Sequence, residues 1–88
     1  MKFSIVTPTY NHAKYIDTTI KSVLENKKHY PNVEYIVIDG NSKDGTQDVV
    51  RSYGKDVDVF ISEPDDGQSD AINKGFTHAT GDIYAYIN

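Results

Sequence analysis

Four short apolar segments alternate with longer amphipathic segments along the chain. The apolar segments are rich in Val, Ile, Tyr and Phe and are bounded by turn-forming residues, which is typical of β-strands. The unbroken apolar run Tyr35-Ile36-Val37-Ile38 indicates a strand that is buried on both faces, as in a parallel sheet. The pattern therefore predicts strands over residues 3–7, 34–39, 57–62 and 83–88.

Three segments between these strands carry apolar residues at spacings of three and four, which predicts helices. For the second helix, Asp44 or Thr46 is a suitable N-cap and Gly54 a suitable stop. For the third, Gly81 follows at the position of a C-terminal cap. The predicted helices cover residues 14–26, 46–53 and 68–80.

The resulting order, β-α-β-α-β-α-β, predicts an α/β fold with three α-β-α layers and a mostly parallel, Rossmann-like sheet. In open sheets of this kind, ligands bind outside the carboxyl ends of the strands. The loops to inspect are therefore residues 7–14, 39–46 and 63–70, which hold most of the unusual polar chemistry.

The first two loops offer candidate ligand groups. Thr9 has a hydroxyl, Tyr10 has a flat ring on which a base could stack, and the loop lacks the glycines of a phosphate-binding turn. A purely structural turn is about equally compatible with this loop. Asp39 ends a buried strand, and a carboxylate there costs free energy unless it is paired. Asp44 fits a helix cap as well as a functional role.

The third loop is strongly acidic. It has four carboxylates within eight residues, at Glu63, Asp65, Asp66 and Asp70. Some of them complement the positive N-terminus of the helix that follows. We expect an acidic cleft, which would need a divalent cation to receive a phosphorylated ligand. The three histidines show no metal-ligand spacing.

Composition narrows the function classes. The 88 residues form one small domain with a net charge of −4 and scattered Lys and Arg, which argues against nucleic acid as a partner. There is no cysteine, so disulfides and thiolate metal sites are excluded. No apolar run approaches the roughly 20 residues of a membrane span. We expect a cytoplasmic protein, peripheral to the membrane if the full-length protein associates with it.

Several motifs together resemble the family 2 glycosyltransferases, which have the GT-A fold. In the family's order they read SIVTPTYN at 4–11, TIKSVL at 19–24, EYIVIDGNSKDGT at 34–46, ISEPDDGQSDAINKG at 61–75 and ATGD at 79–82. The resemblance implies transfer of a sugar from a nucleotide-diphosphate donor, typically a UDP-sugar. Transfer would go to an acceptor hydroxyl with inversion, in polysaccharide or glycoconjugate synthesis.

The resemblance also implies roles for individual residues. Thr9 and Tyr10 would line the base pocket, Asp39 would hydrogen-bond the base, and Gly67 would let the backbone approach the donor. The implied nucleotide-binding set is Pro8, Thr9, Tyr10, Asn11, Asp39, Asp44, Asp66, Gly67, Asp70, Lys74 and Asn88.

In the family, the fourth strand leads into an acidic motif that holds Mg²⁺ or Mn²⁺, and Asn88 matches its first position. The metal ligands and the general base would then lie outside residues 1–88. We expect these residues to be the N-terminal, donor-binding part of a GT-A domain, with the acceptor half absent and no catalytic residue within it. The implied partners are a nucleotide-diphosphate sugar and a sugar or lipid-linked acceptor.

The sequence also bears on two functions other than glycosyl transfer. A non-catalytic nucleotide-sugar-binding or assembly module remains an alternative, because an exposed fourth strand carrying Tyr84 and Tyr86 could pair with a second copy in a homodimer. A phospho-acceptor signalling domain needs acidic residues after the first strand. This chain has Thr7-Pro8-Thr9-Tyr10 there, so that class is disfavoured.

Overall fold

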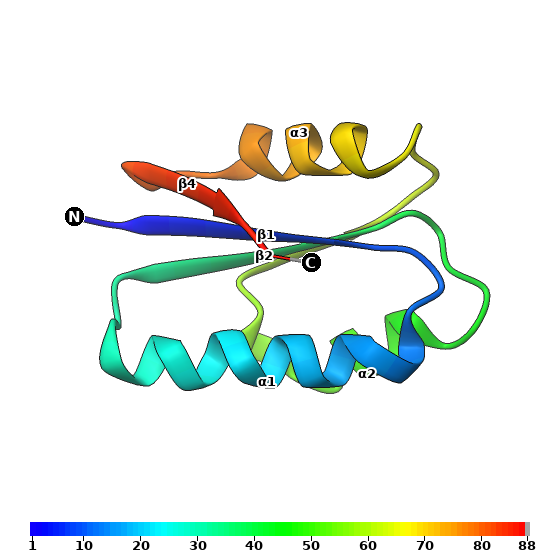
Figure 1. Cartoon of the computed structure of the whole chain (residues 1–88), viewed down its shortest axis with the longest axis horizontal. Helices are drawn as coiled ribbons and strands as arrows, with labels where there is room; N and C mark the ends of the chain where they lie inside the picture. The colour runs from blue at the N-terminus through cyan, green and yellow to red at the C-terminus, as the bar shows by residue number, and fades with distance from the viewer. Residues whose placement is uncertain (88) are drawn as a thin grey trace.

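The computed structural model describes residues 1–87 and contains one parallel four-stranded sheet between two helical layers (Figure 1). The strands lie in the order β3-β2-β1-β4, and all three pairings are parallel. This confirms the predicted α/β class. The strands are β1 (Phe3–Thr9), β2 (Val33–Asp39), β3 (Val59–Ser62) and β4 (Ile83–Tyr86).

The helices cover both faces of the sheet. Helices α1 (Ala13–His29) and α2 (Thr46–Arg51) lie on one face and α3 (Gln68–His78) on the other, with a short 3-10 turn, η1 (Gly54–Asp56), before β3 (Figure 1). Successive residues of a strand point to opposite faces. Accordingly, Tyr35 and Val37 of β2 pack in the α1/α2 core, whereas Ile36 and Ile38 pack with Ala71 of α3.

Strand β1 extends two residues beyond the predicted end, through Pro8. The carbonyl of Val6 accepts the N–H of Ile87 on the β4 side, and that of Thr9 accepts the N–H of Gly40 on the β2 side. The backbone N–H and C=O groups of successive β1 residues therefore point alternately toward β4 and toward β2. The backbone of Pro8, two residues after Val6, points toward β4. The β1–β4 register ends at Val6 with Tyr86, so the N–H that proline lacks has no ladder partner to lose there.

Three of the predicted helix caps and stops were wrong. The N-cap of α2 is Gly45, at φ +93°, and its C-cap is Ser52 rather than Gly54. Asp44 lies one residue before the N-cap, where it accepts the N–H of Thr46 at 3.1 Å and that of Ala13, the first residue of α1, at 3.0 Å. The C-cap of α3 is Ala79 rather than Gly81. Gly81 is pressed against β1, because a Cβ built on it would lie 2.6 Å from Ser4 Oγ.

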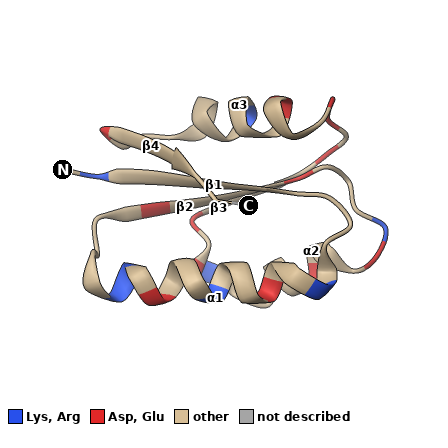
Figure 2. Ribbon diagram, viewed as in Figure 1, with Lys and Arg blue, Asp and Glu red and all other residues tan. Residues whose placement is uncertain are grey.

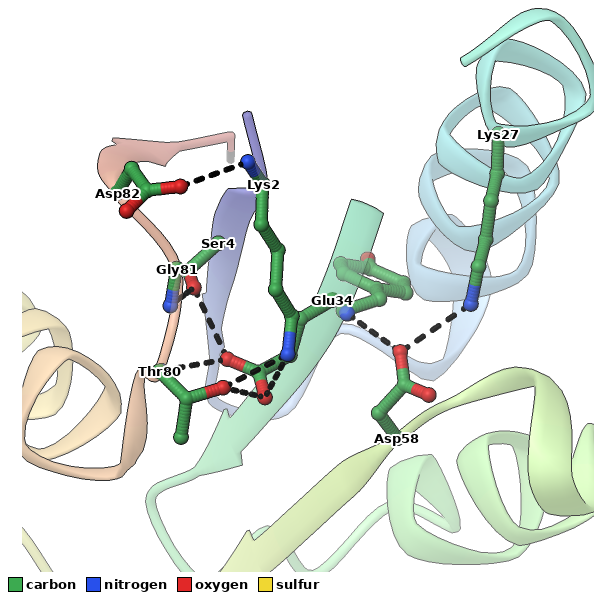
Figure 3. Close-up of polar contacts among 9 residues, drawn as sticks. Lys2, Ser4, Lys27, Glu34, Asp58, Thr80, Gly81 and Asp82 are labelled. Carbon is green, nitrogen blue, oxygen red and sulfur yellow. Dashed lines mark hydrogen bonds and ion pairs between the residues drawn. The ribbon is translucent and has the colours of Figure 1, made fainter. Parts of the chain in front are cut away.

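A polar network joins the starts of β1 and β2 to the loop before β4 (Figure 3). The carboxylate of Glu34 accepts hydrogen bonds from Ser4 Oγ and from both the N–H and the hydroxyl of Thr80, each at 2.9 Å. Lys2 Nζ lies 3.6 Å from the same carboxylate. The network holds β4 beside β1 at the amino ends of these strands, which is the end of the sheet opposite the ligand loops.

Charged side chains lie mainly on the helices and loops, with both signs along α1 (Figure 2). Within residues 1–87, no helix has the length and apolar character needed to cross a membrane.

Candidate functional site

A cleft of about 600 Å³ opens where β1, β2 and β3 end. Its walls come from all three loops that the sequence singled out, because the carboxyl ends of parallel strands meet at one edge of the sheet. The lining residues are Pro8, Thr9, Tyr10, His12, Gly40, Asn41, Lys43, Pro64, Asp65, Gly67, Gln68 and Ala71. Four of the predicted nucleotide-binding residues, Pro8, Thr9, Tyr10 and Gly67, are among them.

Thr9 and Tyr10 give the cleft two groups suited to a ligand. The Tyr10 side chain is 55% exposed, so its ring is available for stacking. Thr9 is only 5% exposed, and its Oγ1 is buried without a hydrogen-bond partner among the described residues. A buried hydroxyl left unpaired costs free energy, which a bound ligand could recover by pairing with it.

Asn11 binds the first loop to the second. Its side-chain oxygen accepts the N–H of Lys43 at 2.8 Å, and its own N–H donates to Ser42 Oγ at 2.7 Å. Asn11 has φ +51°, a conformation that asparagine tolerates better than most residues. Its role here is to fix the cleft walls relative to each other.

Asp39 lies beneath the cleft and does not line it. It is fully buried. One carboxylate oxygen accepts the N–H of Ser42 at 2.9 Å and Ser62 Oγ at 2.8 Å, and the other accepts Ser42 Oγ. These bonds satisfy the pairing that a buried carboxylate requires. In this structure, Asp39 organises its own loop and ties it to the end of β3.

The other predicted polar residues also lie outside the cleft lining. Asp44 joins α1 to the start of α2, and Asp70 accepts the N–H of Asp66 at 2.9 Å. Lys74 donates to the carbonyl of Pro64 at 2.9 Å and pairs with Glu63 at 3.2 Å. Burial tends to lower the pKa of Lys74, but Glu63 and the neighbouring aspartates outweigh it and leave the pKa raised. Asn88 lies outside the described residues.

The cleft is less acidic than the sequence suggested. Of the aspartates and glutamates of residues 1–87, only Asp65 lines it, together with the cation Lys43 and with His12. The expectation of an acidic cleft was wrong: four carboxylates bond to backbone N–H groups, hydroxyls or lysines elsewhere, and the exposed Asp66 does not line the cleft. The four are those of Asp39, Asp44, Asp70 and Glu63. A phosphorylated ligand would therefore meet one cationic side chain here.

Residues 1–87 contain no group of three or more His, Cys, Asp or Glu side chains that could hold a metal ion. The described residues thus do not fit a divalent-cation site by themselves.

Comparison with known sequences identifies the family. The sequence profile described as Glycosyl transferase family 2 matches residues 4–88, nearly the whole chain. The chain belongs to glycosyl transferase family 2.

Among relatives, TuaG of Bacillus subtilis (strain 168), a glycosyltransferase whose name assigns it to teichuronic acid biosynthesis, is 35% identical over 97% of this chain and 34% of its own length. The uncharacterized glycosyltransferase alr2836 of Nostoc sp. is 32% identical over 100% of this chain and 28% of its own. The chain therefore spans about a third of the length of these relatives.

Two solved structures are similar in fold. S. aureus TarS 1–349 in complex with UDP-GlcNAc has a TM-score of 0.86 and 27% identity, covering 99% of this chain and 26% of TarS. A mannosyltransferase from Pyrobaculum calidifontis, in complex with GDP-Man and Mn²⁺, has a TM-score of 0.82 and 30% identity, covering 94% of this chain and 26% of its own. Both confirm the fold class.

Sequence reasoning missed some cleft residues. Asp65 was expected only to complement the N-terminus of the following helix, and Lys43 and Gly40 were not among the predicted ligand contacts. The available signal was position, since each lies in a loop after the carboxyl end of a strand.

Proposed function

We propose that this chain binds the nucleotide-diphosphate sugar donor of an inverting glycosyltransferase, a UDP-sugar by preference, whose acceptor is a hydroxyl of a sugar or lipid-linked molecule. The cleft would receive the nucleoside, with the base on Tyr10 and a polar atom of the ligand on Thr9 Oγ1. Membership of family 2 and the nucleotide sugars named for two similar structures support this proposal. The name of TuaG supports a role in polysaccharide synthesis.

One observation carries the proposal: the exposed ring of Tyr10 lines a cleft at the carboxyl ends of parallel strands, and the neighbouring Thr9, which also lines it, has a buried hydroxyl without a hydrogen-bond partner among the described residues. Such a cleft is the usual ligand position in open α/β folds. The ring supplies a surface for a base, and the hydroxyl supplies a hydrogen bond that the folded chain leaves unused.

Calorimetric titration of the chain with UDP, GDP and UDP-GlcNAc, with and without Mn²⁺, tests the proposal. We expect saturable one-to-one binding, with NMR shift changes at Thr9, Tyr10, Gly40 and Gly67. The proposal would be contradicted if a chain whose NMR spectrum shows that it is folded bound none of these nucleotides at millimolar concentrations.

A divalent cation is proposed for the whole enzyme, supported by the Mn²⁺ in the mannosyltransferase complex. When bound, such an ion neutralises the charge of a diphosphate. Because residues 1–87 offer no ligand cluster, we expect Mn²⁺ to change the affinity of this chain for UDP only weakly.

One observation favours the alternative of an assembly module. Strand β4 is an edge strand, and Ile83, Tyr84 and Tyr86 on it are 40%, 48% and 54% exposed. An exposed edge with large apolar side chains is suited to pairing with another segment or a second copy. Light scattering tests this: a concentration-dependent dimer that Tyr86→Lys dissociates supports it, and a strict monomer contradicts it.

A further inference from the structure

The carboxylate that lies in the cleft is Asp65, not Asp39. Asp39 is fully buried, and both of its oxygens already accept hydrogen bonds from Ser42 or Ser62. To contact a ligand it would have to give up part of this network, and the loop would have to open. A ligand in the cleft as it stands meets a different acid.

Asp65 reaches the centre of the cleft wall because residue 40 has no side chain. A Cβ built on Gly40 would lie 3.0 Å from Asp65 Oδ2 and 3.2 Å from Tyr10 Cδ1. The carboxylate and the edge of the ring thus both lie against the space that a side chain at residue 40 would occupy. Any larger residue at position 40 would displace one of them.

The two oxygens of Asp65 have different surroundings. Oδ1 accepts the N–H of Gly67 at 3.0 Å, which fixes the side chain on the loop before α3. Oδ2 has no hydrogen-bond partner among residues 1–87 and lies on the side of Gly40, whose missing side chain also makes room for Tyr10. Thr9, which lines the same cleft and is only 5% exposed, has a hydroxyl without a hydrogen-bond partner among the described residues, and this is an independent sign that a ligand completes the site.

We propose that Asp65 determines which base the cleft accepts, by taking a hydrogen bond on Oδ2 from a ring N–H of a keto base stacked on Tyr10. This inference rests on the proposed function and deepens it. Uracil presents N3–H as a donor, and guanine presents N1–H. Cytosine has a lone pair at N3 and its donor at the C4 amino group instead, so a carboxylate positioned for N3–H would face that lone pair unless the base shifted. The site therefore selects uridine or guanosine nucleotides over cytidine nucleotides.

The test compares UDP with CDP on wild type and on Asp65→Asn. The asparagine keeps an oxygen for the Gly67 N–H and turns an NH₂ donor toward the base. We expect wild type to bind UDP roughly ten- to a hundredfold more tightly than CDP. In Asp65→Asn, we expect the affinity for UDP to fall by a similar factor and the affinity for CDP to be at least as high as in wild type.

Asp48→Asn is the matched control. It makes the same change of charge on α2, at a side chain that is 90% exposed and remote from the cleft lining, and should leave both affinities unchanged. NMR spectra of all variants verify folding. A second variant, Gly40→Ala, should weaken UDP binding because its methyl group crowds Asp65 and Tyr10.

Three outcomes would overturn the inference. One is UDP binding by Asp65→Asn with unchanged affinity and unchanged preference over CDP. The second is an equal loss of UDP and CDP affinity, which would place Asp65 on the ribose or phosphates. The third is a wild-type chain that binds neither nucleotide, which contradicts the proposed function as well. Only the first two leave nucleotide binding itself intact, so the failures are distinguishable.

Discussion

Glu34 and Thr80 are joined by two hydrogen bonds, although they lie 46 residues apart in the sequence. Both go to the Glu34 carboxylate, which is only 12% exposed and also accepts a bond from Ser4. Burial alone would raise the pKa of this carboxyl. The hydrogen bonds from Thr80 and Ser4 and the charge of Lys2 outweigh it, and the pKa is lowered below the ordinary 4.5.

Replacing Glu34 by Gln should destabilise the fold at neutral pH by about 1–2 kcal/mol, because bonds to a charged acceptor become bonds to a neutral one. A carboxyl whose pKa is lower in the folded state stabilises the fold above its unfolded pKa, near 4.5, and the contribution is lost as the pH falls through the folded value. Urea denaturation at pH 7 and at decreasing pH values measures this. The gap between wild type and variant should narrow below pH 4.5, whereas Glu25→Gln, an exposed control, should show little difference.

Gly75→Ala should destabilise the protein by about 1–3 kcal/mol, although alanine is the better helix former. A Cβ on Gly75 would lie 2.4 Å from Val6 Cγ1, so α3 would have to move away from β1. The measurement is the urea midpoint of Gly75→Ala, Val6→Ala and the double variant. The two changes should cost less together than their sum, and strict additivity would show that the contact does not limit the packing.

Thr9→Val should separate stability from binding. The Thr9 hydroxyl makes no hydrogen bond within the described chain, so removing it should leave the free energy of unfolding equal or slightly raised. Affinity for UDP should fall roughly three- to tenfold, the value of one neutral hydrogen bond. Calorimetry and urea denaturation on the same preparation check both parts. A clear loss of stability would mean that the hydroxyl already has a partner.

Tyr10→Ala should weaken UDP binding by about 1–3 kcal/mol, the usual value of stacking a base on an aromatic ring. Tyr10→Phe keeps the ring and should keep most of the affinity. Since the Tyr10 side chain is more than half exposed, neither change should alter the urea midpoint by much. Equal binding by the alanine and phenylalanine variants would exclude stacking at this position.

Most of the fold could be predicted because the apolar pattern has one consistent interpretation. The run from Tyr35 to Ile38 is buried on both faces, as the sequence indicated, and all four strands and three helices are present. The errors are at element ends. Pro8 is compatible with β1 only because β4 pairs no farther than Val6, and such a neighbour relation is not visible in local sequence.

The candidate site was predicted at the right edge of the sheet but with an incomplete set of residues. The loops could be ranked by their position after strands. The sequence could not show which of several carboxylates lines the cleft. That depends on hydrogen bonds between loops, such as the one from Ser62 to Asp39. Gly40 was not among the predicted site residues, and only its proximity to Asp65 and Tyr10 shows that its missing side chain makes room for both.

The strand order has a consequence for synthesis on the ribosome. Of the four described strands, β1 is synthesised first, yet it lies between β2 and β4, and β4 is synthesised last. While the nascent chain grows, one hydrogen-bonding edge of β1 stays open until more than 70 further residues have been made. The exposed edge of a half-built sheet attracts other strands. We expect this stage, more than the finished protein, to depend on chaperones and to limit the soluble yield of destabilised variants.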